Sequence, residues 1–224
     1  MTIGKISTYI LINKNESKCI IGSLYDKELH NINLIKQNDC ISISEYKNGN
    51  MEGLTFFLNL KKKDYYFGYT QENYKSGFGL EKQVNDFIDI YIGYYLRGKF
   101  NKIGLLYTPK FMYYGGFLND RLTGICQILL NNKARYFGEI VDGNLEGKGV
   151  YFFHDNTNFE GSFKNNLANG PGKIIYPNGD TFEGIFKNNS KHGESNYKSK
   201  CNQRIFCGFY DDGQEILEKS FYRY

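Results

Sequence analysis

Aromatic side chains recur along this chain at a nearly constant spacing, each two positions before a glycine. The triplets end at Gly68, Gly93, Gly115, Gly138, Gly161, Gly184 and Gly208, so consecutive glycines are 22 to 25 residues apart. The same phase continues toward the amino terminus in a weaker form, with Ser44 and Gly22 in the glycine position. A period of this regularity indicates an internal repeat of one supersecondary unit.

Each repeat has the residue pattern of a β-hairpin. If the triplet glycine is position 0, position +5 is Gly, Asn or Asp in eight units, and these residues tolerate the positive φ of a turn. Position +9 is usually Gly, and position +2 is usually large and apolar. A turn centred near +5 to +6 predicts three cross-strand pairs, which are 0 with +11, +2 with +9, and −2 with +13.

These paired positions all lie on one face, because side chains alternate along a strand. That face is aromatic and glycine-rich. The other face is charged in the units at Gly161 and Gly184, where it carries Glu160, Lys173 and Glu183. One aromatic face and one solvated face predict an all-β fold, an elongated single-layer twisted antiparallel sheet of consecutive β-hairpins.

The motif from Tyr136 through Gly138, Gly143, Gly147 and Gly149 resembles the membrane occupation and recognition nexus (MORN) repeat. The resemblance is clearest over residues 113–193 and degenerate before residue 66. About nine such repeats would fill residues 1–213. Residues 214–224 are then a carboxy-terminal cap or docking segment, formed by a short helix or by a last strand over the aromatic face. Residues 3–12 are predicted to form an edge strand.

The MORN resemblance implies a scaffold that supports dimerisation or attachment at membranes and the cytoskeleton. It also implies phospholipid or phosphoinositide binding as a proposed activity of such repeats. Some members carry an appended enzyme domain, but the repeats here occupy nearly all of the 224 residues. We therefore expect no enzymatic activity.

Composition adds little chemistry to this picture. The net charge of +4 is mild and does not favour nucleic-acid binding. The five cysteines are scattered, the three histidines fit no zinc spacing, and no apolar run approaches the length of a membrane span. We expect a cytoplasmic protein, associated with the cytoskeleton or the cytoplasmic face of a membrane, with no catalytic residues, cofactor or metal.

Two binding functions remain open. In the first, the aromatic face is an open groove for partner proteins, including a second copy of this chain; the competing interpretation is that the aromatics cover one another as an ordinary core. The predicted groove residues are Tyr95, Tyr113, Phe117, Tyr136, Ile140, Tyr151, Phe159, Phe163, Phe182 and Phe186. In the second, Lys61, Lys62, Lys63, Arg97, Lys99 and Lys102 contact an anionic phospholipid surface.

Overall fold

The computed structural model describes residues 7–13, 17–25, 28–84, 88–201, 205–217 and 221–223. The chain divides into two compact units. Unit 1 comprises residues 1–109 and 117–120, and unit 2 comprises residues 110–116 and 121–224. Both units are built from antiparallel strands, and the described residues contain no α-helix, which confirms the predicted all-β hairpin fold. No helix in this part of the chain could cross a membrane.

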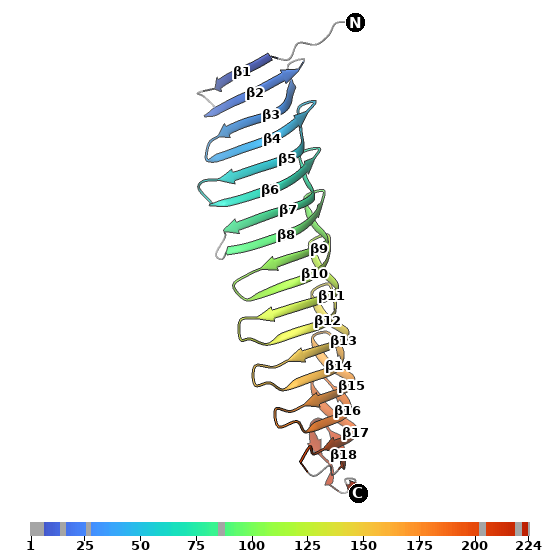
Figure 1. Cartoon of the computed structure of the whole chain (residues 1–224). Coiled ribbons are helices and arrows are strands. Elements are labelled where there is room, and N and C mark those ends of the chain that lie inside the picture. Colours follow the sequence, from blue (N-terminus) through green and yellow to red (C-terminus); the bar gives the residue numbers. More distant parts are fainter. Residues whose placement is uncertain are drawn as a thin grey trace. The chain divides into compact units, whose positions relative to one another are not determined.

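Unit 1 holds the first nine strands, and each pairs antiparallel with the next (Figure 1). They are β1 (Ser7–Asn13), β2 (Lys18–Tyr25), β3 (Glu28–Gln37), β4 (Cys40–Lys47), β5 (Asn50–Asn59), β6 (Asp64–Gln71), β7 (Tyr74–Val84), β8 (Ile88–Leu96) and β9 (Lys99–Tyr107). Strand β10 (Phe111–Leu118) contributes residues to both units.

Unit 2 continues the same pattern from β11 to β18, again with each strand paired to its successor. These strands are β11 (Arg121–Leu130), β12 (Arg135–Val141), β13 (Asn144–Phe152), β14 (Asn158–Lys164), β15 (Leu167–Ile175), β16 (Thr181–Lys187), β17 (Ser190–Lys198) and β18 (Ile205–Asp211).

The hairpin turns are one position earlier than predicted. In the hairpin of β12 and β13, Val141 pairs with Asn144, so Asp142 and Gly143 alone form the turn at positions +4 and +5. Their φ angles are 49° and 84°. Two central residues with positive φ define a type I′ turn, whose twist suits an antiparallel hairpin. The predicted positive φ at +5 is confirmed.

The predicted register holds in one half of each hairpin and fails in the other. Gly138 faces Gly149 and Tyr136 faces Tyr151, as the 0/+11 and −2/+13 pairs require. The register then shifts after Gly138. Gly147, at +9, therefore faces Phe163, the +2 residue of the next hairpin, rather than +2 of its own. A β-bulge, in which the second strand carries extra residues, explains this difference.

The aromatic rings of positions −2 and +2 form the core of the sheet. Tyr66, Tyr91 and Tyr136 at position −2 each lie over a Gly–Gly pair: a Cβ added at Gly149 would lie 2.5 Å from the Tyr136 ring. The Tyr136 hydroxyl donates a hydrogen bond of 2.9 Å to the carbonyl of Glu139, which holds the ring flat against the backbone. Its ring meets Phe163 of the next hairpin edge-on at 5.3 Å. Glycine on both strands leaves room for the Tyr136 ring, whereas Cys126 and Ser195 take the place of the second glycine in the hairpins of Tyr113 and Phe182.

The carboxy-terminal segment extends the sheet at its last strand. Strands β19 (Gln214–Glu215) and β20 (Phe221–Arg223) both pair antiparallel with β18. Of the two predicted forms, the structure supports a last strand, but that strand pairs at the edge of the sheet instead of folding over the aromatic face. At the other end, β1 forms the predicted edge strand from Ser7, and residues 3–6 lie outside the described part.

Candidate binding surfaces

The predicted aromatic groove is closed by its own side chains. Nine of its ten residues are 0–7 % exposed, and Tyr151 alone is half-buried. Rings of adjacent hairpins meet edge to face, as Phe159 does with Phe163 and Phe186. Their burial contradicts the prediction that these side chains line an open groove, and it supports the competing interpretation of a core.

An open groove instead lies on the opposite face of unit 2, with a volume of about 1230 Å³. We call it the trench. Its lining residues occupy the same six positions in successive hairpins: −1, 0, +1, +10, +11 and +12. Glycine pairs such as Gly138 with Gly149 and Gly161 with Gly172 form its floor. The trench is therefore not the predicted groove: it lies on the other face of the sheet and contains none of the ten predicted groove residues.

Two rows of cross-strand neighbours form the walls of the trench. One row runs Phe137, Val150, Glu160, Lys173, Glu183, Asn196 and Cys207 over consecutive strands. The other contains the facing pairs Ile125 with Glu139, Lys148 with Ser162, Pro171 with Ile185, and Glu194 with Phe209. Four carboxylates and two ammonium groups among the lining residues give the trench a formal charge of −2. The trench is thus a net acidic surface that also carries apolar side chains.

In unit 1, positions −1 and +12 are apolar in every hairpin. A single row of directly facing residues crosses nine strands without a polar side chain: Ile10, Ile21, Leu34, Ile43, Phe56, Phe67, Leu80, Ile92 and Leu105. We call this row the apolar ladder. The prediction of a charged, solvated second face, which rested on the hairpins at Gly161 and Gly184, is therefore wrong for unit 1.

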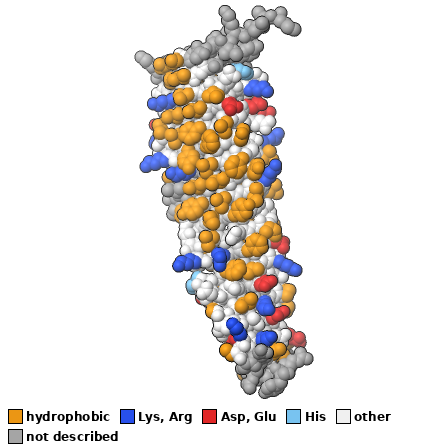
Figure 2. Space-filling model, viewed as in Figure 1, with side chains coloured by type: hydrophobic (Ala, Val, Ile, Leu, Met, Phe, Trp, Pro, Cys, Tyr) orange, Lys and Arg blue, Asp and Glu red, His pale blue; other side chains and the backbone are white. Residues whose placement is uncertain are grey.

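Two further rows border the apolar ladder on the same face. The turn-side row contains Ile32 facing Glu45, Leu54 facing Tyr69, and Phe78 facing Tyr94. The link-side row runs Ile12, Cys19, Lys36, Ile41, Leu58, Tyr65, Lys82, Ile90 and Tyr107. Figure 2 shows hydrophobic side chains gathered over these strands. Eleven side chains of the three rows are 39–68 % exposed: Ile10, Ile12, Ile21, Ile32, Ile43, Leu54, Phe67, Tyr69, Phe78, Tyr94 and Tyr107.

The predicted lipid-contact residues do not form one cluster. Lys61, Lys62 and Lys63 lie in the link between β5 and β6, whereas Arg97 lies in the turn after β8. Strands β6 and β8 run in the same direction, so the link and the turn are at opposite strand ends, about 25 Å apart at 3.3 Å per residue. Lys99 and Lys102 lie near Arg97 on β9. A flat membrane surface could therefore contact the lysines of the link or the basic residues near Arg97, but not both groups together.

Unit 1 also buries an ion pair beside its aromatic core. Glu81 accepts hydrogen bonds from the Lys75 ammonium, from Gln83 Nε2 at 3.0 Å, and from the Tyr95 hydroxyl at 2.9 Å. Burial, followed by the negative charge of Glu81, raises the pKa of Tyr95 far above its usual range. Lys75, Glu81 and Gln83 line a small cavity of about 410 Å³. The Glu81 carboxylate is fully engaged by its neighbours, so the cluster is structural.

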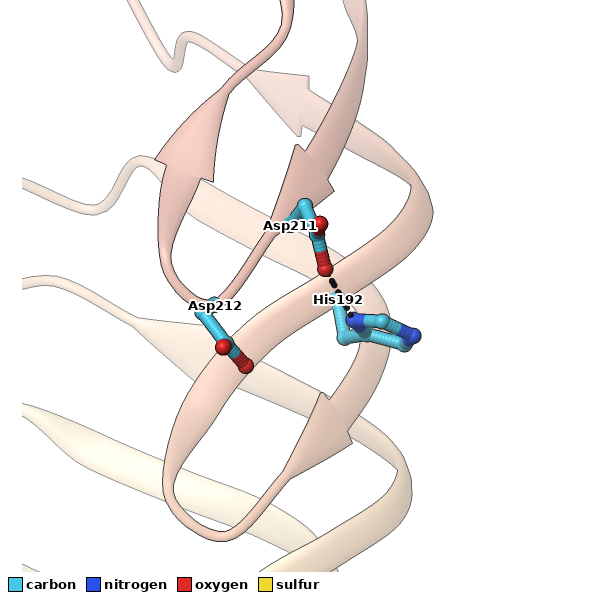
Figure 3. A group of neighbouring side chains, drawn as sticks. All are labelled: His192, Asp211 and Asp212. Atoms are coloured by element: carbon cyan, nitrogen blue, oxygen red, sulfur yellow. Dashed lines mark ion pairs between the residues drawn. The ribbon is translucent and has the colours of Figure 1, made fainter.

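One group of potential metal ligands occurs among the described residues. His192 Nδ1 lies 3.3 Å from an Asp211 carboxylate oxygen, and Asp212 is beside them in the turn after β18 (Figure 3). The sequence did not indicate this cluster, because His192 lies far from the two aspartates along the chain. Both aspartates are exposed, and the arrangement amounts to a surface ion pair when the imidazole is protonated. We assign no metal to it.

The fold and its repeated positions define a β-hairpin repeat protein. The MORN repeat family matches three consecutive stretches of the chain, residues 136–157, 159–181 and 182–194, so these hairpins are MORN repeats as predicted. No curated protein matches the sequence.

Two solved structures share features of the fold. The TCP10 domain of Danio rerio CPAP, in complex with a peptide of Danio rerio STIL, is 11 % identical with a TM-score of 0.45, over 94 % of this chain and 98 % of that chain. The SAS-4 (dCPAP) TCP domain of Drosophila melanogaster, in complex with a Proline Rich Motif of Ana2 (dSTIL), is 13 % identical with a TM-score of 0.42, over 80 % of this chain and 90 % of that chain.

Proposed function

We propose that this protein is a non-enzymatic scaffold that binds partner proteins, and that the trench of unit 2 is one binding surface. The trench carries this proposal. Its volume of about 1230 Å³ exceeds the roughly 300–1,000 Å³ of pockets that enclose small molecules. It crosses the strands from β11 to β18, which is about 34 Å at 4.8 Å per strand. An extended chain of about ten residues has that length.

The walls of the trench indicate the chemistry of this extended segment. Glu160 and Glu183 occupy position −1 of consecutive hairpins, and Ile185 and Phe209 provide apolar surface at position +1. Opposite charge steers a partner and fixes its register, while apolar contacts supply affinity. The partner segment should therefore be extended, net basic, and interrupted by apolar side chains. The MORN repeats at 136–194, which form most of the trench, support a scaffolding role.

A peptide-display selection against the purified full chain tests this function. Selected segments should be basic and apolar, and they should lose at least tenfold in affinity against the Glu160→Lys/Glu183→Lys variant, a loss of about 1.4 kcal/mol. The control is Glu52→Lys, which makes the same kind of charge change on an exposed residue of unit 1. Selected peptides that bind both variants equally, or no selected peptides at all, would refute the trench as a binding surface.

The proposal places the scaffold at a cytoskeletal or membrane-associated structure, reached through its protein partners. It does not include direct phospholipid binding, because the candidate basic residues are divided between opposite strand ends. Liposome flotation with anionic vesicles checks this exclusion: recovery should equal that with neutral vesicles.

A further inference from the structure

We infer that the apolar ladder of unit 1 is the interface of a symmetric homodimer in which two copies pack face to face. This inference concerns a different unit from the trench and does not depend on trench binding. The exposed face of unit 1 has a large apolar area. Its eleven most exposed apolar side chains are five aromatic and six aliphatic residues. At roughly half exposure an aromatic side chain of about 150–250 Å² presents about 100 Å², and a smaller Ile or Leu side chain presents roughly 80 Å².

The resulting area is too large for a solvent-exposed face. It amounts to roughly 1,000 Å², compared with about 300–600 Å² for the largest apolar patch of an ordinary monomer. A stable interface needs about 800 Å² from each partner. The face therefore has the area that a dimer requires, and covering it removes a contiguous apolar surface from water.

The form of the face suits a second sheet. The ladder consists of directly facing side chains on adjacent strands, so it is a continuous row flanked by two others. Sheets pack face to face with their strands within about 30° of one another, through rows of this kind. A second copy supplies an identical apolar row, and a two-fold axis in the interface plane brings the two ladders together.

The charges on the face select the direction of that axis. The link-side row carries Lys36 on β3 and Lys82 on β7, which are placed symmetrically about β5. An axis parallel to the strands at β5 would set Lys36 against Lys82 of the other copy. An axis parallel to the ladder instead sets the link-side row of one copy against the turn-side row of the other. Lys36 then lies opposite Ile32 of the second copy, and Glu45 on the neighbouring strand is one strand spacing of about 4.8 Å away, within reach of the lysine side chain. The two-fold axis makes this contact occur twice.

The axis parallel to the ladder therefore brings opposite charges together at two symmetry-related contacts. The axis parallel to the strands places two lysines opposite each other, which is unfavourable. Both side chains are exposed, so exchanging them should leave the fold of each copy intact. The geometry therefore assigns the ladder-parallel axis, with Lys36–Glu45 contacts between the copies.

Sedimentation equilibrium of the full chain over a concentration series tests the dimer. The unaltered chain should associate reversibly, and Ile43→Asp, in the middle of the ladder, should make it monomeric. Ile185→Asp is the matched control, because it changes a similarly exposed isoleucine in unit 2 and should leave the dimer intact. Far-ultraviolet circular dichroism confirms that each variant is folded.

The charge pair tests the register. Lys36→Glu and Glu45→Lys should each weaken association at least tenfold, and the double variant should restore it. A chain that is monomeric at every accessible concentration, or a dimer unaffected by Ile43→Asp, overturns the inference. If the chain is monomeric while Ile43→Asp abolishes binding of a different protein, the face belongs to a heterologous partner. Trench binding by a monomeric chain would leave the proposed function standing.

Discussion

Asn189 and Ala168 hold two consecutive hairpins together through a reciprocal pair of hydrogen bonds. The backbone N–H of Asn189 donates to the carbonyl of Ala168 at 2.9 Å, and the N–H of Ala168 donates to Asn189 Oδ1 at 2.7 Å. The same pair joins Asn166 to Leu145 and Asp120 to Phe100. The residue type at +5 thus serves both the turn and its attachment to the preceding hairpin.

Replacing Asn189 separates these two roles. Asn189→Gly keeps the φ of 69° accessible but removes the side-chain acceptor, so it should lower the free energy of unfolding by about 1 kcal/mol. Asn189→Asp retains the acceptor and should lie within a few tenths of a kcal/mol of the unaltered chain. Urea denaturation measures both. Equal losses in the two variants would show that the hydrogen bond to Ala168 is not the source of stability.

Lys102 occupies a position where most hairpins have glycine. It is the +9 residue of its unit, and its φ is 57°, in the left-handed region that costs a residue with a Cβ about 1 kcal/mol or more. Lys102→Gly should therefore raise the free energy of unfolding by about 1 kcal/mol. Lys102→Ala keeps the Cβ and loses the contact of the ammonium with the Tyr94 ring, so it should give no gain.

Thermal denaturation of the two variants decides the cause. A glycine variant that is more stable than the alanine variant supports backbone strain. Equal stability in the two would assign any effect to the lysine side chain instead.

The repeat predicted the hairpins and their turn residues because those depend on local chemistry, namely positive φ at +5 and alternation along each strand. It did not predict the bulge. Glycine at +9 does face a large +2 residue, but that residue belongs to the next hairpin, as Gly147 and Phe163 show. Two extra residues in one strand leave the sequence period unchanged, so the period alone could not distinguish the two partners.

The site was predicted on the wrong face for a related reason. Aromatic residues are conspicuous in the sequence, but rings that lie over glycine pairs cover one another, as the burial of Tyr91 and Tyr136 shows. The apolar ladder was detectable: positions −1 and +12 are apolar in all of the first four units, from Ile21 to Leu105. The Lys75–Glu81 pair had no comparable signal, because Lys75, Glu81 and Tyr95 come together only in the folded sheet.

The buried tyrosines should make the fold sensitive to alkali. Burial, and to a smaller extent Asp120, raises the pKa of Tyr91 from 10.0 to about 12. Burial likewise raises the pKa values of Tyr66, Tyr113 and Tyr136. The folded state therefore holds these protons more tightly than the unfolded chain does. This stabilisation is fully present below pH 10 and is lost as the pH rises from 10 toward 12 and beyond.

Tyr91→Phe isolates one of these groups. The variant loses the 3.0 Å hydrogen bond to the Tyr94 carbonyl and should be about 1 kcal/mol less stable at neutral pH. Phenylalanine does not titrate, so the deficit should shrink between pH 10 and 12. Chemical denaturation at a series of pH values measures the difference. A deficit that stays constant over this range would contradict a raised pKa for Tyr91.

The Lys75–Glu81 pair should be replaceable only as a unit. Lys75→Met leaves the carboxylate of Glu81, which is 10 % exposed, without its counter-ion and should cost about 2–3 kcal/mol. The corresponding positions in most other hairpins are apolar, as with Leu145 at +7 and Ile174 at +13. The variant Lys75→Met/Glu81→Leu/Tyr95→Phe removes the charges and the hydroxyl that depends on them.

Its stability should return to within about 1 kcal/mol of the unaltered chain, because no buried polar group then lacks a partner. Urea denaturation of the single and triple variants makes the comparison, and the slope of the transition shows whether the folded state remains compact. A triple variant that is less stable than Lys75→Met alone would mean that the ion pair itself stabilises unit 1. An intermediate value would measure how much of the cost comes from packing around Tyr66, whose ring lies 5.0 Å from the Lys75 ammonium.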